Sequence, residues 1–256
     1  MTLPAGGGDD MTRFFADREK SDFAGGDVTL SGSDGEHIRV LRMKAGDRIT
    51  VCDGEGTDYH CVLTKTENAR AEAKVIGLEQ NPAEPSIRCT VLAGMSKGDR
   101  PDYTVQKCTE AGAAEIVFFP CARSVSRPDD KNLEKKLDRW RRIAEEAAKQ
   151  SGRGAIPGVF SAPDFAAALD IAVKRDLALF MYETGERISL KQALNNAEPF
   201  SSVAIMTGPE GGFEEFEADL ARAAGLIPCS MGQAIFRCET APVIALACIM
   251  FHTDNY

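Results

Sequence analysis

The order of apolar and polar residues divides the chain into two regions with different repeats. From Arg13 to about Gln80, Gly and Asp interrupt the sequence every 8 to 12 residues, and short β-type runs lie between them. Regular short strands with turn signals are typical of a small β-barrel. The predicted strands are Val28–Leu30, Arg48–Cys52, Tyr59–Leu63 and Ala71–Ile76, and a short helix is predicted over Glu36–Lys44.

The segment Asn81–Pro85 separates this region from one in which strands alternate with helices. Its two prolines disfavour helix and cannot donate to a strand ladder, so it is predicted to be a linker. The strands predicted beyond it are Ile87–Ala93, Glu115–Phe119, Asp176–Tyr182, Ser202–Thr207 and Leu226–Met231, and the helices are Asp102–Ala111, Lys131–Gln150, Glu214–Ala224 and Thr240–His252. This alternation indicates an α/β domain with a mostly parallel sheet. We therefore predict a disordered tail over residues 1–10, a β-barrel domain over 11–83 and an α/β domain over 84–256.

The helix Lys131–Gln150 is the clearest amphipathic element. Its apolar face carries Leu133, Leu137, Trp140, Ala144 and Ala147, and its opposite face carries Lys131, Lys135, Arg142 and Lys149. A basic face can contact nucleic-acid phosphates. The interleaved Asp138, Glu145 and Glu146 favour the simpler interpretation of a solvated polar face.

Composition excludes several classes of protein. The 256 residues are 43% apolar and 27% charged, which are ordinary globular values. The longest nearly apolar run, Ala241–Phe251, is too short for a bilayer, which takes roughly 20 residues. None of the eight cysteines forms a Cys-x-x-Cys pair and there are three histidines, so no metal site is expected. No secretory signal is recognisable, and reduced thiols in the cytoplasm are expected.

The net charge of -9 argues against a nucleic-acid partner, but the charge is unevenly distributed. Residues 123–153 carry ten basic and six acidic side chains, a net charge of +4. The sign therefore reverses across one loop and the long helix.

The first segment with candidate chemistry is Val203–Phe213. An apolar strand runs directly into Gly208-Pro209-Glu210-Gly211-Gly212, and a helix follows from Glu214. Ligands of open α/β sheets bind beyond the carboxyl ends of strands, where glycines let backbone amides approach closely. The segment is neither a P-loop nor a G-x-G-x-x-G motif. A ligand loop and a plain tight turn both remain open.

A second segment, Met231–Pro242, lies between a predicted strand and the last helix. Thr240 is a candidate helix cap, and Pro242 suits a first helical turn. The simplest interpretation of Arg237 and Glu239 is an ion pair. Basic clusters also occur at Arg123–Pro128 and Arg39–Lys44. Several such loops at the strand ends of one sheet strengthen the case for a site.

Taken together, these segments resemble the small-subunit (16S) ribosomal RNA uridine-N3 methyltransferase family (RsmE-type), within the SPOUT class of knotted methyltransferases. The landmarks, in family order, are Arg13-Phe14-Phe15, His37–Arg42, Lys97–Arg100, Gln106–Gly112, Arg123-Ser124, Gln150–Arg153, Ile156-Pro157, Gly208–Phe213 and Gly232–Ala241. One departure is Ala234, where the family usually carries an arginine. That departure bears on one RNA or cofactor contact.

The resemblance implies a PUA-like β-barrel for RNA, followed by a SPOUT-type parallel sheet whose C-terminal end forms a trefoil knot. It also implies S-adenosylmethionine as cofactor, a homodimer formed by helices near the knot, and 16S ribosomal RNA or the small ribosomal subunit as partner. The implied cofactor-binding residues are Tyr182, Thr207, Gly208, Pro209, Gly211, Gly212, Met231, Gly232, Ile235, Phe236, Thr240 and Ala241.

Arg237 is the residue expected to stabilise the uracil anion, because a fixed cation favours negative charge on the carbonyl oxygens. Glu210 or Glu239 accepts the N3 proton or orients Arg237, and both options remain open. The residues expected to contact RNA are Arg13, His37, Arg39, Arg42, Lys97, Arg123, Arg127 and Arg153. Without the resemblance, His37 would be read as a core histidine.

Two alternatives stay open beside this interpretation. The first is a SPOUT methyltransferase that acts on another RNA or another atom, such as a tRNA ribose 2′-OH. The second is an RNA-binding relative that has lost activity, for which Ala234 is the supporting feature. A nucleotide-dependent oxidoreductase lacks a dinucleotide fingerprint.

Overall fold

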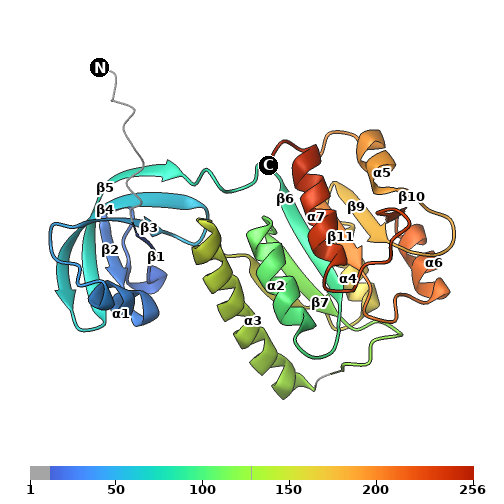
Figure 1. Ribbon diagram of the computed structural model, residues 1–256, viewed down its shortest axis with the longest axis horizontal. Coiled ribbons are helices and arrows are strands. Elements are labelled where there is room, and N and C mark those ends of the chain that lie inside the picture. Colours follow the sequence, from blue (N-terminus) through green and yellow to red (C-terminus); the bar gives the residue numbers. More distant parts are fainter. Residues whose placement is uncertain (1–11, 128) are drawn as a thin grey trace. The chain divides into compact units, whose positions relative to one another are not determined.

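The chain divides into two compact units (Figure 1). A computed structural model describes residues 12–127 and 129–256, so the tail predicted over residues 1–10 lies outside the described part. The first unit ends at Glu84 and also takes in Gly152–Ala155. The second unit holds Pro85–Ser151 and Ile156–Tyr256. The first unit thus includes a four-residue segment that is distant in sequence, which the pattern of apolar residues did not indicate.

The first unit is built on a five-stranded sheet with the order β1-β3-β4-β5-β2. Its strands are β1 (Arg13–Phe15), β2 (Asp27–Leu30), β3 (Arg48–Cys52), β4 (Thr57–Glu67) and β5 (Arg70–Gln80). The β1–β3 pair is parallel and the other neighbours are antiparallel. Residues two apart share one face of a strand, and Cys61 and Leu63 of β4 accordingly enter one core with Phe14 and Ile49.

Helix α1 (Gly32–Val40) begins and ends earlier than the predicted Glu36–Lys44. Ser31 is extended at the N-cap position, which suits a residue that starts a helix. Arg42 has a left-handed backbone conformation, with φ of 57°, which ends the helical path before Lys44. The predicted bounds were wrong because apolar residues did not mark either end. A single turn of 3-10 helix, Arg18–Lys20, precedes β2.

A buried polar network holds Gly152–Ala155 in the first unit. The carboxylate of Asp58, 1% exposed, accepts hydrogen bonds from Arg13 Nη1 at 2.6 Å and Asn81 Nδ2 at 2.9 Å. Asn81 Nδ2 also donates to the Gly152 carbonyl at 3.1 Å. Arg153 donates to Glu84 at 2.8 Å, and its side chain is almost wholly buried. Buried charges of this kind require partners, so these contacts are part of the folded core of the unit.

The second unit is built on a seven-stranded sheet with the order β10-β12-β9-β11-β6-β7-β8, in which every paired neighbour is parallel. Its strands are β6 (Arg88–Gly94), β7 (Glu115–Phe119), β8 (Gly158–Ser161), β9 (Leu177–Met181), β10 (Ile188–Ser189), β11 (Ser202–Thr207) and β12 (Ile227–Ser230). Its helices are α2 (Arg100–Glu110), α3 (Asp130–Ser151), α4 (Phe165–Ala172), α5 (Leu190–Asn196), α6 (Glu215–Ala223) and α7 (Ala241–His252). The α/β fold with a parallel sheet predicted from the sequence is confirmed.

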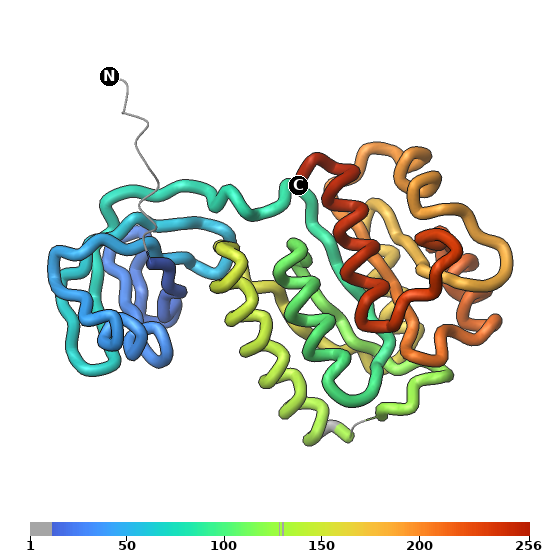
Figure 2. Tube along the Cα trace, in the orientation of Figure 1, coloured from blue at the N-terminus to red at the C-terminus, as the bar shows by residue number. Residues whose placement is uncertain are grey.

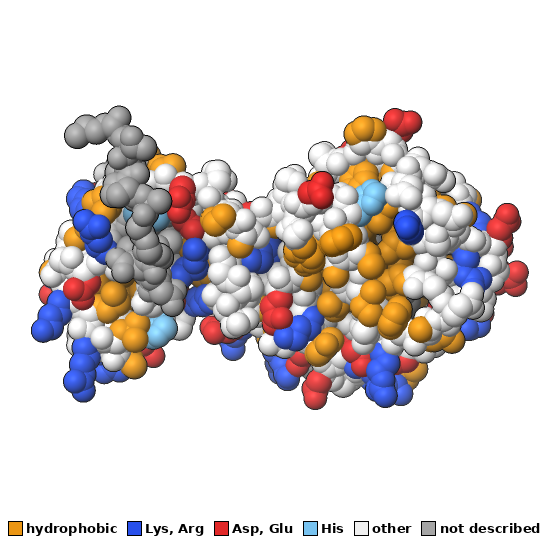
Figure 3. Space-filling view, turned by 45° about the horizontal axis from the view of Figure 1, so that its top comes forward, with side chains coloured by type: hydrophobic (Ala, Val, Ile, Leu, Met, Phe, Trp, Pro, Cys, Tyr) orange, Lys and Arg blue, Asp and Glu red, His pale blue; other side chains and the backbone are white. Residues whose placement is uncertain are grey.

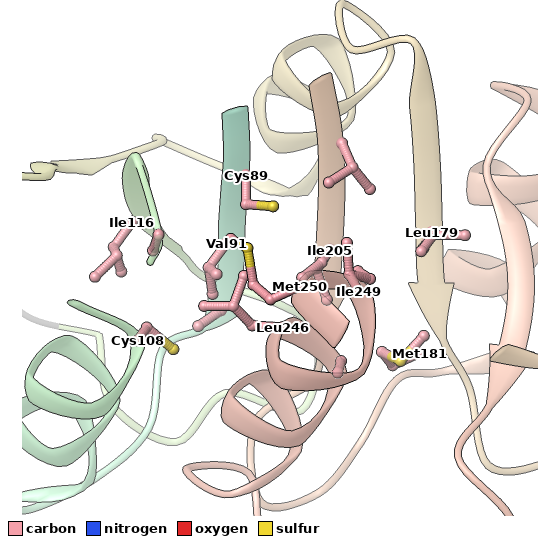
Figure 4. Close-up of a cluster of buried hydrophobic side chains, with 14 of the residues drawn as sticks. Cys89, Val91, Cys108, Ile116, Leu179, Met181, Ile205, Leu246, Ile249 and Met250 are labelled. Carbon is pink, nitrogen blue, oxygen red and sulfur yellow. The ribbon is translucent and has the colours of Figure 1, made fainter. Parts of the chain in front are cut away.

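Helices cover both faces of this sheet, which explains why its strands are continuous apolar runs. Alternate residues of β6 and β11 enter two different cores, one packed by α2, α3, α5 and α7 and the other by α4 and α6. Figure 4 shows side chains of the first core, where Leu246 and Ile249 of α7 lie near Val91 and Ile205. The predicted face of α3 is confirmed, since Trp140 and Ala144 are buried in this core.

In the second unit, four short elements were not predicted from the sequence, namely β8, α4, β10 and α5; in the first unit, β1 and the 3-10 turn were not predicted either. Strand β10 has two residues and α5 has seven, so neither is long enough to display a period. Local capping marks both helices instead. Asp164 accepts from the Ala167 amide at 2.8 Å, and Ser189 and Gln192 form a capping box.

Helix α7 is apolar on almost every side, yet it is only 12 residues long. Pro242, Ala245 and Leu246 are buried, whereas Cys248 and Phe251 are exposed. Within residues 12–127 and 129–256, no helix has the length and apolar character needed to cross a membrane. The path of the chain from β12 into this helix can be followed in Figure 2.

The Ile205 side chain should make a large contribution to stability, because it is fully buried at the centre of the sheet. We expect Ile205→Ala to lower the free energy of unfolding by about 2–5 kcal/mol, through lost burial and the cavity left behind. Denaturant unfolding measures the change. Leu220→Ala on α6, where Leu220 is 50% exposed, is the control and should stay within about 0.5 kcal/mol. Equal effects of the two substitutions would contradict the packing described here.

Candidate active site

A cavity of about 640 Å³ lies beyond the carboxyl ends of β9, β11 and β12. Because parallel strands point the same way, their carboxyl ends meet at one edge of the sheet. The loops that follow these strands, together with Arg100 and Arg123, supply the lining of the cavity. The fold therefore defines a ligand-binding α/β domain, with its site at the edge where such domains bind small molecules.

The loop after β11 is held in place by close backbone packing. A Cβ atom on Gly94, at the end of β6, would lie 2.6 Å from the backbone nitrogen of Pro209. A Cβ on Gly208 would lie 3.1 Å from the Cα of Gly212, which itself has a φ of 67°. The Gly212 amide donates to the Pro209 carbonyl at 2.9 Å and closes the turn. These glycines are needed where they stand, and they leave the loop compact at the rim of the cavity.

The loop after β12 leads into α7 through a turn at Arg237. The amides of Thr240 and Ala241 both donate to the Arg237 carbonyl at 2.9 Å. Thr240 occupies the predicted N-cap position, but its side chain makes no capping hydrogen bond. Pro242 stands in the first turn as predicted, where its missing amide hydrogen costs nothing.

Two carboxylates of the cavity, Glu210 and Glu239, meet the same cation. Arg100 Nη1 donates to Glu210 Oε1, and Arg100 Nε lies 3.6 Å from Glu239 Oε2. Glu210 Oε1 also accepts the Lys97 backbone amide at 2.8 Å. Burial alone would raise the pKa of Glu210, but the Lys97 amide and the charge of Arg100 outweigh it and lower that pKa. The ion pair between Arg237 and Glu239, the simplest interpretation of the sequence, does not form.

Arg237 is exposed and lines the cavity. Among the described residues, no carboxylate lies within ion-pairing distance of its guanidinium and no side-chain hydrogen bond engages it. Arg237 is therefore a cavity-lining cation without a carboxylate partner in the described part of the chain. A cation in this condition is available for a bound anion or for negative charge that develops during a reaction.

The structure brings eleven of the twelve predicted cofactor-binding residues to the cavity; Thr240 does not line it. Tyr182 contributes its ring from the loop after β9, and it is 8% exposed. The sequence-based prediction did not include Arg100, Glu183, Thr184, Arg187 or Gln233, which also line the cavity. Arg100 falls in a segment that resembles the family, but its partners are distant in sequence. Ala234 lines the cavity as well, with an exposed side chain.

The residues predicted to contact RNA occupy different environments. His37, Arg39 and Arg42 are exposed on or next to α1, and the His37 ring meets Phe14 edge-on, with 5.6 Å between centroids. Arg13 and Arg153 are instead engaged with carboxylates of the first unit. These two arginines thus have structural roles in this unit.

The remaining predicted RNA contacts are in the second unit. Lys97 is exposed beside Glu210, and Arg123 lines the cavity while it pairs with Glu214 at 2.8 Å. Arg127 donates to the Cys121 carbonyl at 2.9 Å and so supports its own loop. Lys97 and Arg123 are the members of the predicted set that stand next to the cavity.

The cysteines are mostly buried apolar side chains, as predicted. Six of the eight are buried, and burial raises the pKa of Cys89 to about 12, so this thiol stays uncharged at neutral pH. In the described ranges, no group of three or more His, Cys, Asp or Glu residues has the arrangement of a metal site.

Comparison with known proteins agrees with this arrangement. A family model for an RNA methyltransferase domain matches residues 83–250, and one for an RNA methyltransferase PUA domain matches residues 30–76. Ribosomal RNA small subunit methyltransferase E from Bacillus subtilis is 33% identical over 250 residues, which cover 95% of this chain and 98% of the relative. The protein of the same name from Synechocystis is 33% identical over 86% of this chain and 71% of the relative.

A solved structure of Ribosomal RNA small subunit methyltransferase E from Neisseria gonorrhoeae, bound to S-adenosyl methionine, has the same fold. Its TM-score is 0.80 at 31% identity, over 94% of this chain and 97% of that one. The chain described here belongs to this family of RNA methyltransferases.

The close approach of Gly94 to Pro209 predicts a stability effect. In Gly94→Ala the new methyl group would overlap backbone and ring atoms of Pro209, so the loop after β11 has to move. We expect a loss of about 1–3 kcal/mol in the free energy of unfolding, measured by thermal or denaturant melting. Gly77→Ala in β5 is the matched control, because its Cβ would meet only His60 at 3.6 Å. A neutral Gly94→Ala would show that the loop is not tightly packed.

Proposed function

We propose that this protein transfers a methyl group from S-adenosylmethionine to N3 of one uridine in 16S ribosomal RNA. Family membership supports the broader statement, an RNA methyltransferase that uses S-adenosylmethionine and acts on small-subunit ribosomal RNA. The observation that carries the finer statement is the unpaired Arg237 in a cavity that also holds two carboxylates. The substrate also implies a cytoplasmic enzyme.

The cavity fits the cofactor. Its volume of about 640 Å³ falls in the range of small-molecule sites. Apolar side chains such as Tyr182, Ile235 and Phe236 line it and suit an adenine ring, while the turns at Gly208 and Gly232 expose backbone groups for hydrogen bonding. We propose that twelve residues of the loops around the cavity bind the cofactor. They are Tyr182, Gly208, Thr207, Pro209, Gly211, Gly212, Met231, Gly232, Ile235, Phe236, Thr240 and Ala241.

The cofactor supplies a methyl group already activated on a sulfonium. The chain's own residues then have to make the uridine N3 nucleophilic. Arg237 stabilises the uracil anion by its charge, because negative charge develops on the carbonyl oxygens beside N3 as the proton leaves. A carboxylate of the cavity, Glu210 or Glu239, accepts that proton. The residues that line the cavity would hold the cofactor and present the base to it.

The RNA is proposed to reach the cavity past Lys97 and Arg123, and its backbone is proposed to contact His37, Arg39 and Arg42 of the first unit. All five side chains are exposed. Arg127 is proposed to contact RNA from its own loop, where its guanidinium donates to the Cys121 carbonyl. Arg13 and Arg153 are left out of the proposed contact set because they are engaged with buried or half-buried carboxylates.

Two finer features of the fold belong to the same proposal. We infer that the sheet of the first unit closes into a PUA-like barrel, supported by the PUA family model and by the single core that its strands share. We also infer that the segment leading into α7 forms a trefoil knot, as the resemblance implies. The support is that the Met231–Glu239 segment shares the cavity with the loop after β11.

A homodimer is proposed from the exposed apolar face of α7. A helix that is hydrophobic all round is normally buried, yet Cys248 and Phe251 are exposed and Ile244 is only partly covered. Ile235, 78% exposed, adds to the apolar surface of this unit. Figure 3 shows hydrophobic side chains gathered on the face of the second unit that is turned toward the viewer. A second copy of the chain is the proposed cover.

Methylation of ribosomal RNA tests the function directly. In a strain that lacks the gene, nucleotide mapping of 16S ribosomal RNA should show the loss of one N3-methyluridine, which the wild-type chain restores. Arg237→Ala should fail to restore it, while its affinity for S-adenosylmethionine stays within a few-fold by calorimetry. Arg141→Ala, which removes an exposed arginine paired within α3, should restore it fully. A fully active Arg237→Ala protein would overturn the role of Arg237.

The proposed dimer predicts the effect of a charge on α7. The wild-type protein should have a solution mass near twice the 27.6 kDa of one chain. Phe251→Asp should shift it toward monomer, because the substitution places a charge in an apolar contact that association would desolvate. Light scattering after size-exclusion chromatography measures both. Leu220→Asp on α6 is the control and should remain dimeric; a monomeric wild-type protein would refute the assembly.

A further inference from the structure

The two carboxylates of the cavity are held very differently, although they share one cation. Glu210 is fixed by the Lys97 amide at 2.8 Å and by Arg100 Nη1, which reach the same oxygen atom. Glu239 has a longer contact with Arg100 Nε, at 3.6 Å, and it accepts a hydrogen bond from the Cys238 thiol at 3.3 Å. Glu210 thus has two firm hydrogen bonds, whereas Glu239 has a loose ion pair and one weak donor.

These contacts point to different chemistry for the two groups. A carboxylate that accepts strong hydrogen bonds in its ionised form is a poor base, and the pKa of Glu210 is indeed lowered by the Lys97 amide and Arg100 despite its partial burial. A cation shared by two carboxylates favours the ionised form of both. Arg100 supplies that cation from the first turn of α2, and no catalytic role had been assigned to it.

The geometry points to Arg100 as a positioning residue that anchors Glu210 as a fixed anion and holds Glu239 as the proton acceptor. This inference rests on the proposed function. The uridine N3–H bond breaks and its proton moves to a Glu239 carboxylate oxygen. The N3 electron pair then forms the bond to the methyl carbon, and the electrons of the broken carbon–sulfur bond stay on sulfur. Arg100 touches neither reacting atom and acts through the two carboxylates.

Other charged groups around the cavity also influence the pH dependence of methyl transfer. Arg123, Glu183, Arg187 and Arg237 also line the cavity, and the Lys97 side chain is exposed beside Glu210. Cys238 faces Glu239 with a thiol whose pKa burial raises to about 12, so the thiol remains a neutral donor near neutral pH. Of these cations, only Arg100 pairs with both Glu210 and Glu239 in the described part of the chain.

The test is the pH dependence of methyl transfer to 16S ribosomal RNA in single-turnover experiments. In Arg100→Gln the two carboxylates lose their shared cation, so the acid limb of the rate profile should move to higher pH by at least about half a unit. Activity should recover in part at alkaline pH. Arg100→Lys keeps the charge and should keep the acid limb near that of the wild type. A loss of rate by the same factor at every pH would mean that Arg100 serves the fold alone, and would overturn the inference.

Glu239→Gln tests the proton acceptor itself. General bases contribute about 10²–10⁴-fold, so a loss of that order is expected, with a rate that rises steadily with pH as the substrate ionises by itself. An acid limb that survives unchanged in Glu239→Gln would assign the proton to another group. Arg139→Gln is the control, because Arg139 also forms an ion pair with α2, through Asp102, but does not line the cavity. Its profile should match the wild type.

A titration that needs no turnover separates this inference from the proposed function. NMR of ¹³C-labelled glutamate, with Glu210 assigned through Glu210→Gln, should show that the pKa of Glu210 rises in Arg100→Gln. If the wild-type protein methylates no uridine, the proposed function fails while this titration still reports on Arg100. If the wild-type protein is active and the Glu210 titration does not change, Arg100 does not anchor Glu210. Should Arg100→Gln fail to fold, Arg100→Lys and Glu239→Gln still decide the roles of the charge and of the acceptor.

Discussion

The sheet of the second unit depends on one constraint, the burial of its central strands on both faces. Val91 and Leu92 of β6 are neighbours in sequence, yet each is fully buried in a different core. Parallel strands joined by helical crossovers are buried in this way, and in this parallel sheet the carboxyl ends of the strands meet at one edge. The close packing of Gly94 on Pro209 follows from this constraint, because β6 and β11 are neighbours whose ends lie level. The parallel sheet thus determines where the cavity lies, and the loops supply its lining.

The electrostatics of the cavity depend on where its cations find partners. Arg100 is committed to two carboxylates, whereas Arg237 faces the cavity without one among the described residues. If Arg237 were paired with Glu239, its charge would be neutralised within the protein and would not be available to a substrate. Arg100, in the first turn of α2, contacts both carboxylates, and neither of them pairs with Arg237. In the proposed mechanism, the pairing of Arg100 with both carboxylates leaves the charge of Arg237 available to the substrate.

The sequence predicted the long elements and the loops that carry glycine, and it failed where contacts are distant. Strands such as Ser202–Thr207 were found because their interior is continuously apolar, and α3 because its apolar face repeats from Leu133 to Ala147. The two-residue β10 has no readable period. The family resemblance indicated the loops of the cavity and included the Lys97–Arg100 segment, but it did not place Arg100 in the cavity, because its partner Glu210 is 110 residues away. Similarly, Arg153 looked like a basic surface residue until its partner Glu84, 69 residues away, was seen.

Contacts that are distant in sequence also limit what the charge of a segment can predict. The excess of basic residues in 123–153 indicated an RNA-facing surface, but several of them are already paired. Arg139 meets Asp102, Arg141 meets Glu134 and Asp138, and Lys149 meets Glu145. Exposed pairs of this kind stabilise little, yet they reduce the field that a polyanion would experience. The solvated-face interpretation of α3 therefore gains support, and the proposed RNA contacts lie elsewhere, at Lys97 and Arg123 beside the cavity and at His37, Arg39 and Arg42 in the first unit. The charge of a segment predicts a partner only after the cations that pair with carboxylates outside the segment, such as Arg139 with Asp102 and Arg153 with Glu84, have been taken into account.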